Sequence, residues 1–381
     1  MHIAVITEYN PFHSGHEYQL AEIRRAFPDA CITAIMGGIF SQRGAPYITT
    51  PYVRANAAVN CGADLVLELP FPFSCAPAKI FARAGVEIAA KIGADMLAFG
   101  SECGDVEVLK TTLDRLDGDE IKKEIKKIED KTLSKMQLYS IAYKNLYGNE
   151  CSDKPNDILG VEYLRAIKNG KYKLTPYTIK RVGDFKSGEG GFASATSIRR
   201  SVGLDGICAL TGAVPKKAEA IFRDAYEKGL FGADIEKLSS AILLKLASAS
   251  SDSAFSSGGL LSHIKKAAST ATSIANLMEN TSTKRYTDAE ISRCILFSLL
   301  DVKTDDLDSP IYYTKLFGAT KKGCEILNGI SDIEIITKPS ATKKLSQNAK
   351  AQYEKSLLAE RAFALCFNGC YEHTKQTPVI I

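Results

Sequence analysis

The 381-residue sequence contains no tryptophan, only five histidines, and no long apolar run. Without about 18 consecutive apolar residues, it offers no candidate for a transmembrane helix. Its first residues, MHIAVITEYN, show no basic segment followed by a long apolar stretch, so we expect no secretory signal. These absences predict a cytoplasmic protein with no membrane partner, and no obligate protein partner is evident.

Neither charge sign dominates the sequence. Lysine and arginine number 48, aspartate and glutamate number 44, and the formal net charge is +4. This mild excess permits a nucleic-acid partner but does not require one, because the clustering of basic residues matters more than their total.

The ten cysteines do not suggest a disulfide framework. Most stand singly in apolar segments, as small buried residues do in cytosolic proteins. Cys366, Cys370 and His373 are the exception, with the spacing C-x3-C-x2-H. Zinc prefers four ligands and closer pairing, so we expect a helix face here rather than a metal site.

The chain length and the alternation of apolar segments predict two domains. Short apolar runs rich in branched residues, each typical of a buried strand, alternate with segments of helical spacing over the first hundred residues. The expected strands are His2–Glu8, Ala30–Met36, Gly62–Pro70 and Gly93–Ser101. The expected helices are Gly15–Phe27, Tyr52–Asn60 and Pro77–Ile92.

This alternation predicts an α/β fold with a parallel sheet and right-handed crossovers, as in Rossmann-like domains. Ligands bind such sheets beyond the carboxyl ends of the strands. We therefore expect the loops after Glu8, Met36, Leu69 and Phe99 to converge on one crevice.

Further along, a charged helix is expected over Asp117–Lys131, a helix over Asn156–Asn169 and a strand over Leu174–Arg181. Lys122 and Lys126 lie on the charged helix, whose lysines either form a solvated face or a stripe that contacts RNA. The Gly/Ser-rich segment Lys186–Ala195 is expected to be a mobile loop.

Strand patterns fade after Val202, so we place a domain boundary near residue 205. Residues 206–381 are expected to form a mainly helical domain. Helical spacing runs from Pro215 to Leu300, with a polar interruption at Ser248–Ser257, and a short strand is possible at Glu334–Thr337.

The segment Asn10–His16, NPFHSGH, carries the strongest chemical pattern. It joins the first strand to the first helix, and a helix N-terminus attracts phosphate through its free N–H groups and its dipole. Gly15 allows close approach of a ligand, and His13 and His16 are suited to donate to phosphate oxygens. Two of only five histidines at this junction favour a function over a simple surface turn.

The segment resembles the HxGH signature of the nucleotidyltransferase superfamily, whose members carry a second motif after the last strand of the fold. The matching segment here is SATSIR, Ser194–Arg199. Thr196 or Ser197 is expected to cap a helix, and Arg199 to bind the outer phosphates of ATP. By itself the segment is also compatible with an ordinary helix cap.

Several loops read together are similar to the tRNA(Met) cytidine acetate ligase family. They are EYNPFHSGH, FSQRG, LVLELPF, FGSE, PND, IKR and SATSIR, with TKKGCEILNGI and IITKPS near the end. The resemblance implies activation of acetate by ATP, with Mg²⁺ expected, and transfer of acetyl to N4 of the wobble cytidine of elongator methionine tRNA. It also implies an N-terminal catalytic domain over residues 1–205 and a C-terminal domain that is a candidate for tRNA binding.

The resemblance assigns catalytic roles to His13, His16 and Arg199. It implies that ATP is contacted by Thr7, Glu8, Tyr9, Asn10, Pro11, Phe12, His13, Ser14, Gly15, His16, Leu20, Gly100, Asn156, Arg181, Ser197 and Arg199. One position departs from the family pattern: Ile39 precedes Phe40, where a polar residue is common.

Other residues have open alternatives. Arg43 contacts RNA phosphate, or the acetate carboxylate, or is an ordinary surface arginine. Glu68 is expected to form a structural hydrogen-bonded pair in its buried strand, with a catalytic role as the alternative. Tyr47 or Tyr52 is a candidate to stack on the cytidine, although core packing is favoured.

Three other functions compete with the acetate ligase. The first is a small-molecule nucleotidyltransferase, which would not need the long helical region. The second is an adenylating ligase for another acid or RNA. The third is a non-catalytic RNA-binding protein that retains a vestigial nucleotide site, against which the intact HSGH and SATSIR segments argue.

Overall fold

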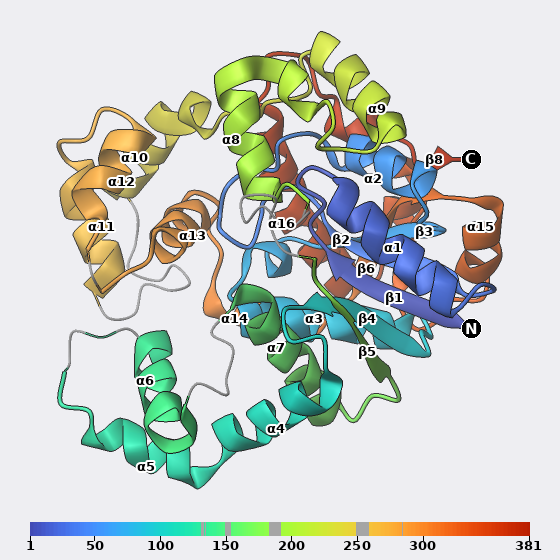
Figure 1. The fold of residues 1–381 in the computed structure, drawn as a ribbon. Coiled ribbons are helices and arrows are strands. Elements are labelled where there is room, and N and C mark those ends of the chain that lie inside the picture. Colours follow the sequence, from blue (N-terminus) through green and yellow to red (C-terminus); the bar gives the residue numbers. More distant parts are fainter. Residues whose placement is uncertain (131–132, 134, 149–153, 183–191, 249–258, 284) are drawn as a thin grey trace.

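The computed structural model describes residues 1–130, 133, 135–148, 154–182, 192–248, 259–283 and 285–381. Its central sheet has the strand order β5-β4-β1-β2-β3-β6-β7, and β8 pairs with β6 (Figure 1). The first five strands are β1 (His2–Thr7), β2 (Cys31–Gly37), β3 (Leu65–Leu69), β4 (Met96–Ser101) and β5 (Thr175–Lys180). They pair in parallel, which confirms the predicted α/β fold.

Helices cover both faces of the sheet, which is why its inner strands read as continuous apolar runs. On one face α1 (Ser14–Ala26), α2 (Pro51–Asn60) and α9 (Lys216–Glu227) share an apolar core. On the other face α3 (Ala78–Lys91) and α7 (Pro155–Gly170) share a second core. The helices expected in the first hundred residues are thus confirmed, with ends that differ by a residue or two.

Three helices extend from the α/β unit at the lower left of Figure 1. They are α4 (Val106–Asp117), α5 (Asp119–Lys127) and α6 (Lys135–Tyr147). Ile121 of α5 packs with Ala142 and Tyr143 of α6 in a small apolar cluster. The charged helix expected over residues 117–131 is α5, which starts after Gly118 and is shorter than predicted.

The helical spacing predicted from Pro215 to Leu300 is confirmed among the described residues. This region follows α8 (Ala195–Asp205) and contains α9, α10 (Ser239–Ser248), α11 (Leu260–Ala268), α12 (Ile274–Thr281), α13 (Asp288–Leu299) and α14 (Thr304–Asp308). Short 3-10 helices are Phe73–Cys75, Gly206–Leu210, Ile235–Leu238, Pro339–Lys344 and His373–Lys375. Residues 249–258, which include most of the predicted polar interruption, and residues 183–191, in and before the Gly/Ser-rich loop, lie outside the described residues.

The chain then returns to the sheet. Strand β6 (Tyr313–Ala319) runs antiparallel beside β3, while β7 (Glu334–Ile336) and β8 (Val379–Ile380) run parallel to β6. Helices α15 (Lys321–Leu327) and α16 (Gln347–Ala364) accompany them. The short strand expected at 334–337 is confirmed as β7, whereas β6 and β8 were not predicted. The division at residue 205 stays a prediction, and strands from both sides of it share one sheet.

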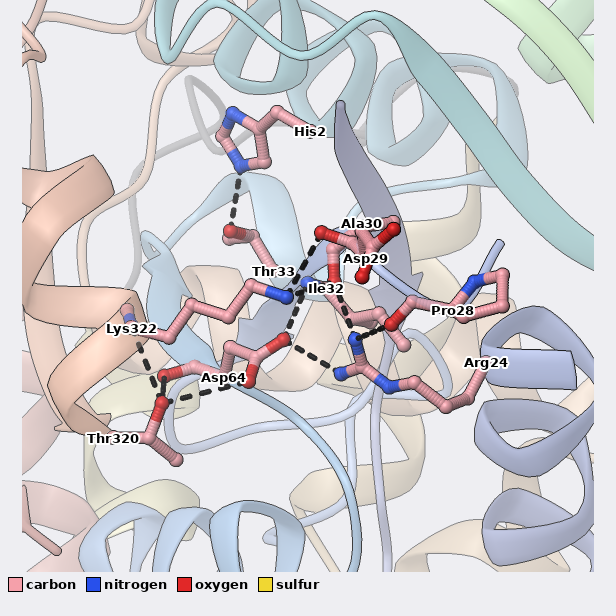
Figure 2. Close-up of polar contacts among 11 residues, drawn as sticks. His2, Arg24, Pro28, Asp29, Ala30, Ile32, Thr33, Asp64, Thr320 and Lys322 are labelled. Carbon is pink, nitrogen blue, oxygen red and sulfur yellow. Dashed lines mark hydrogen bonds and ion pairs between the residues drawn. The ribbon is translucent and has the colours of Figure 1, made fainter.

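A polar network at the N-terminal ends of the strands connects the start of α15 to the starts of β2 and β3 (Figure 2). The Asp64 carboxylate accepts hydrogen bonds from the backbone N–H of Ile32 at 2.9 Å and from Arg24 at 2.7 Å. Thr320 donates its backbone N–H to the Asp64 carbonyl at 2.8 Å, and Lys322 donates to the carbonyl of Ala30 at 2.9 Å. The start of α15 is therefore fixed to the starts of β2 and β3.

No helix in the described part of the chain is both long enough and apolar enough to cross a membrane.

Candidate nucleotide site

A cleft of about 300 Å³ opens beyond the carboxyl ends of β1, β4 and β5. Its polar lining comes from Thr7, Glu8, His13, His16, Gln19, Gln42, Arg43, Asn156, Lys180, Arg181 and Ser194. Its apolar lining comes mainly from Ile6, Phe81, Phe99, Leu159, Tyr163 and Phe192. This is the crevice that the strand pattern predicts.

The two histidines of HSGH cap the first helix that borders this cleft. His13 is the N-cap of α1, and its Nδ1 accepts the backbone N–H of Gly15 at 3.0 Å. The backbone N–H of His13 donates to Nδ1 of His16 at 3.3 Å, which completes a capping box. A side chain at Gly15 would place its Cβ 2.9 Å from Cε1 of His13, so only glycine leaves room for this cap.

Both imidazoles are neutral at physiological pH. Burial, together with the nearby charges of Arg181 and Arg199, lowers the pKa of His13 to about 4. Burial and the neighbouring His13 ring hold the pKa of His16 well below its usual value. Because each Nδ1 accepts a backbone hydrogen bond, each ring carries its proton on Nε2. The pair therefore offers two N–H donors beside a helix N-terminus.

The SATSIR segment lies against this loop from the other side. Ser194 is the N-cap of α8, and its Oγ accepts the backbone N–H of Ser197 at 3.2 Å. The prediction that Thr196 or Ser197 caps the helix was wrong, because α8 begins one residue after Ser194. Arg199 donates to the carbonyl of Asn10 at 2.6 Å and to Thr196 at 3.1 Å.

The FGSE and PND segments are hydrogen-bonded to each other where they border the cleft. Glu102 accepts from the Asn156 side chain at 2.6 Å and from the backbone N–H of Asp157 at 2.9 Å. Buried Asp157 in turn accepts the backbone N–H of Glu102 at 2.7 Å. Arg181 lies 4.0 Å from Glu102, and a Cβ at Gly100 would lie 3.3 Å from Cγ of Arg181. A larger residue at Gly100 would displace this arginine.

The structure brings together many of the residues assigned to ATP. Those that line the cleft are Thr7, Glu8, His13, Gly15, His16, Gly100, Asn156 and Arg181. Buried behind them are Tyr9, Asn10, Pro11, Phe12 and Leu20. Ser14 donates to the Ala213 carbonyl at 3.2 Å. Ser197 and Arg199 lie on α8 and are not part of the lining, so their direct contact with ATP stays a prediction.

The residues considered for RNA binding separate into two places. Arg43 is exposed and lines the cleft. Lys122 and Lys126 are exposed on α5 and do not line it, and Lys122 pairs with Asp119 at 2.9 Å. Tyr47 is fully buried with its hydroxyl 3.3 Å from Glu8, and Tyr52 packs edge-to-face on Phe317. Both tyrosines thus pack against the apolar core.

Two expectations for the ELPF segment were wrong. The loop after β3 contributes no residue to the cleft lining, because Phe71 packs on Phe40 and Phe297 instead. Glu68 is buried, but neither carboxylate oxygen has a hydrogen-bond partner among the described residues. Burial raises the pKa of Glu68 to about 7, although the Lys315 ammonium, ion-paired with Glu360, lies close by.

Three further residues of the site carried only weak sequence signals. Gln42 lies in the FSQRG segment and lines the cleft. Glu102 lies in FGSE and Asp157 lies in PND. The hydrogen bond between them joins residues that are 55 positions apart in the sequence. Ile39 is buried among Phe40, Phe297 and Phe363, where it packs as an apolar residue.

The Cys366, Cys370 and His373 spacing does not form a cluster. Cys366 is buried and donates to the Ala362 carbonyl, whereas Cys370 is exposed. Within the part of the chain that the structure describes, no three His, Cys, Asp or Glu side chains lie together in a way that would hold a metal ion.

Comparisons with known proteins extend over the whole chain. The family model of the HIGH nucleotidyl transferases matches residues 1–377. A tRNA(Met) cytidine acetate ligase of Caldanaerobacter subterraneus subsp. tengcongensis is 34% identical, over 96% of this chain and 96% of that protein. One of Halalkalibacterium halodurans is 32% identical, over 100% and 97%. The crystal structure of Thermotoga maritima TmcAL bound with alpha-thio ATP matches 100% of this chain and 99% of that chain, with a TM-score of 0.90 and 27% identity.

Proposed function

Because the chain belongs to the HIGH nucleotidyl transferase family, and within it to the tRNA(Met) cytidine acetate ligases, we propose that it is an ATP-dependent ligase that acetylates tRNA. It activates acetate as acetyl-adenylate and transfers the acetyl group to N4 of the wobble cytidine of elongator methionine tRNA. The observation that carries this proposal is the capping box of His13 and His16, which presents two neutral N–H donors to the cleft.

In the first step an acetate oxygen attacks the α-phosphorus of ATP. The bond from this phosphorus to the bridging oxygen breaks, and pyrophosphate leaves with the electron pair. Nε2–H of His13 and of His16 donate to the phosphate oxygens where charge develops, and the N-terminus of α1 adds its dipole. Neutral imidazoles suit this role because they donate without needing to be reprotonated in each cycle.

Around this centre the other residues position the nucleotide. Arg199 holds the Asn10 carbonyl and thereby couples α8 to the HSGH loop, and its charge lies near His13. Asn156, held by Glu102, is oriented to contact the nucleoside, and Arg181 beside it balances negative charge. Holding both reactants in one crevice is the main contribution of the protein.

In the second step the N4 amine attacks the acetyl carbonyl. The carbon–oxygen bond to AMP breaks, AMP leaves, and the amine loses a proton. Single-stranded loops are the usual targets of sequence-specific RNA recognition, and the wobble base lies in one. The exposed lysines Lys122 and Lys126 of α5, with the C-terminal helical region, are candidates to contact tRNA phosphates.

Mg²⁺ fits this site as a companion of ATP. It commonly binds through substrate phosphates, waters and one or two carboxylates, and the carboxylate of Glu8 lines the cleft. When bound, it would neutralise phosphate charge. Since ATP and tRNA are its substrates, we place the enzyme in the cytoplasm.

The test is a reconstituted reaction of the full chain with ATP, radiolabelled acetate and a methionine tRNA transcript. We expect acetate-dependent release of AMP and pyrophosphate, with label in one acetylated cytidine of the tRNA. A transcript with uridine at the wobble position is the matched control, because it lacks the amine. Failure to consume ATP with any acid would leave only a binding role, and AMP release with a different acid would reassign the substrate.

A further inference from the structure

The FSQRG segment forms a tight turn at the rim of the cleft. Ser41 donates its backbone N–H to the Ala45 carbonyl at 2.8 Å, and Gly44 donates to the Ser41 carbonyl at 2.8 Å. A bridge between Phe40 and Pro46 closes the base of the turn, and Gly44 has a φ of +79°, which favours glycine. The turn 41–45 is therefore a defined local structure.

Two distant parts of the chain clamp this turn. Glu8, which directly follows β1, accepts the backbone N–H of Gln42 at 2.8 Å. Arg293 of α13 donates to the Gln42 carbonyl at 2.8 Å. A Cβ at Gly44 would lie 2.8 Å from the backbone nitrogen of Arg293, so the turn packs directly on that helix. Both hydrogen-bonding groups of the Gln42 peptide backbone are thus occupied.

Two side chains of the turn, those of Gln42 and Arg43, line the cleft. Nε2 of Gln42 is buried and has no hydrogen-bond partner among the described residues, although the side chain lines the cleft. Arg43 lines the same cleft. A buried amide donor and an arginine that share one cleft are suited to a carboxylate, which accepts at both oxygens.

We propose that Gln42 and Arg43 bind the carboxylate of the acid substrate, and that Arg293 is the positioning residue that holds their turn. This inference rests on the proposed function. The acid must approach the α-phosphorus as one anion approaching another, so a guanidinium in the same cleft as His13 and His16 counters the repulsion. The buried Gln42 amide, unlike an exposed basic surface, fits a small ligand within the cleft rather than an RNA backbone.

The test is acetate-dependent exchange of pyrophosphate into ATP, measured without tRNA. We expect Arg43→Gln to raise the KM for acetate at least about tenfold while the KM for ATP stays within about twofold, because a charged hydrogen bond to the acid is lost. The KM for acetate of Arg43→Lys should lie between those of wild type and Arg43→Gln. Gln42→Leu should also raise the KM for acetate. Arg25→Gln is the matched control, since Arg25 is exposed and pairs with Glu22 of its own helix.

Arg293→Met tests the positioning role. It should raise the KM for acetate without changing the KM for ATP, and Arg293→Lys should restore part of the affinity because it keeps a donor. Thermal melting separates this effect from unfolding. An unchanged KM for acetate in Arg43→Gln and Gln42→Leu would overturn the inference, as would a rise only in the KM for tRNA, which would assign Arg43 to RNA phosphate. Wild-type protein without exchange would instead refute the proposed function.

Discussion

The rings of His13 and His16 lie with their centroids 3.8 Å apart, and each ring uses Nδ1 to hold a backbone N–H of the same helix end. This arrangement makes two side chains of the candidate catalytic centre part of the fold itself. These hydrogen bonds set the orientation of both rings, which the proposed donation from their Nε2–H groups to phosphate requires.

The first prediction concerns the stability of the fold in acid. Above pH 6.5 His13 is neutral in both the folded and the unfolded state, so it adds no pH dependence to the free energy of unfolding. Between pH 6.5 and its folded pKa of about 4, the unfolded state binds a proton that the folded state does not, so the free energy of unfolding falls as the pH falls. From pH 7 to pH 5 this loss is about 2 kcal/mol.

We expect His13→Gln to lose about 2 kcal/mol less than wild type over that interval, measured by urea unfolding at each pH. The comparison is between slopes, since the variant also alters the helix cap. Equal pH dependence in the two proteins would contradict a neutral, buried His13.

The second prediction concerns turnover. His16→Ala removes one donor to the α-phosphate, so acetate-dependent AMP formation should fall by about 10²- to 10³-fold. His263→Gln is the control, because this imidazole is hydrogen-bonded to the Thr281 carbonyl in the helical region and does not line the cleft. If His16→Ala retained nucleotide turnover at the control level, the role of the capping box in catalysis would be refuted.

A third prediction compares two buried carboxylates. The pKa of Glu68 is raised to about 7, so wild type loses stability as the pH rises from about 4.5 through 7. Glu68→Gln removes this loss and should be more stable than wild type at pH 8 by up to about 3 kcal/mol. Equilibrium unfolding at pH 5 and at pH 8 measures the free energy of unfolding of wild type and of Glu68→Gln.

Glu87 provides the contrast for that measurement. It is also buried, but it accepts from Lys91 at 2.7 Å, from Arg83 at 3.3 Å and from the backbone of Ile311 at 2.9 Å. Glu87→Gln should therefore destabilise the protein at pH 8. Destabilisation of Glu68→Gln by a similar amount would show that Glu68 has partners in solution.

The fourth prediction concerns the network around Asp64. Asp64→Ala leaves the Ile32 N–H without its acceptor and removes the ion pair of Arg24, and should lower the free energy of unfolding by about 2–4 kcal/mol. The ion pair of exposed Arg25 with Glu22 is the control, and Arg25→Ala should leave the free energy of unfolding close to that of wild type. Equal effects in the two variants would argue against the network as a clamp.

Much of the N-terminal fold was predictable because its signals are local. Apolar runs marked β1 to β4, and the HSGH segment at the first strand–helix junction located the cleft. The error at the α8 cap was small because Ser194, Thr196 and Ser197 are all good capping residues, and only the backbone decides among them.

The features that escaped prediction depend on long-range partners. Strand β6 contains Lys315, which reads as exposed in sequence but is buried in an ion pair with Glu360. Its neighbour in the sheet, β3, lies about 250 residues earlier. Glu68 was expected to have a partner because buried carboxylates usually do, and no sequence pattern reveals one that does not. The Gln42–Arg293 contact likewise joins residues that no local pattern connects.

The late return of the chain to the sheet has a consequence during translation. Every residue that lines the cleft has been synthesised by Ser194, yet β3 gains its antiparallel neighbour only when residues 313–319 leave the ribosome. Until then the apolar LVLEL strand presents an unpaired edge, the kind of surface at which nascent chains aggregate. A chaperone that covers this edge would protect the nascent chain during that interval.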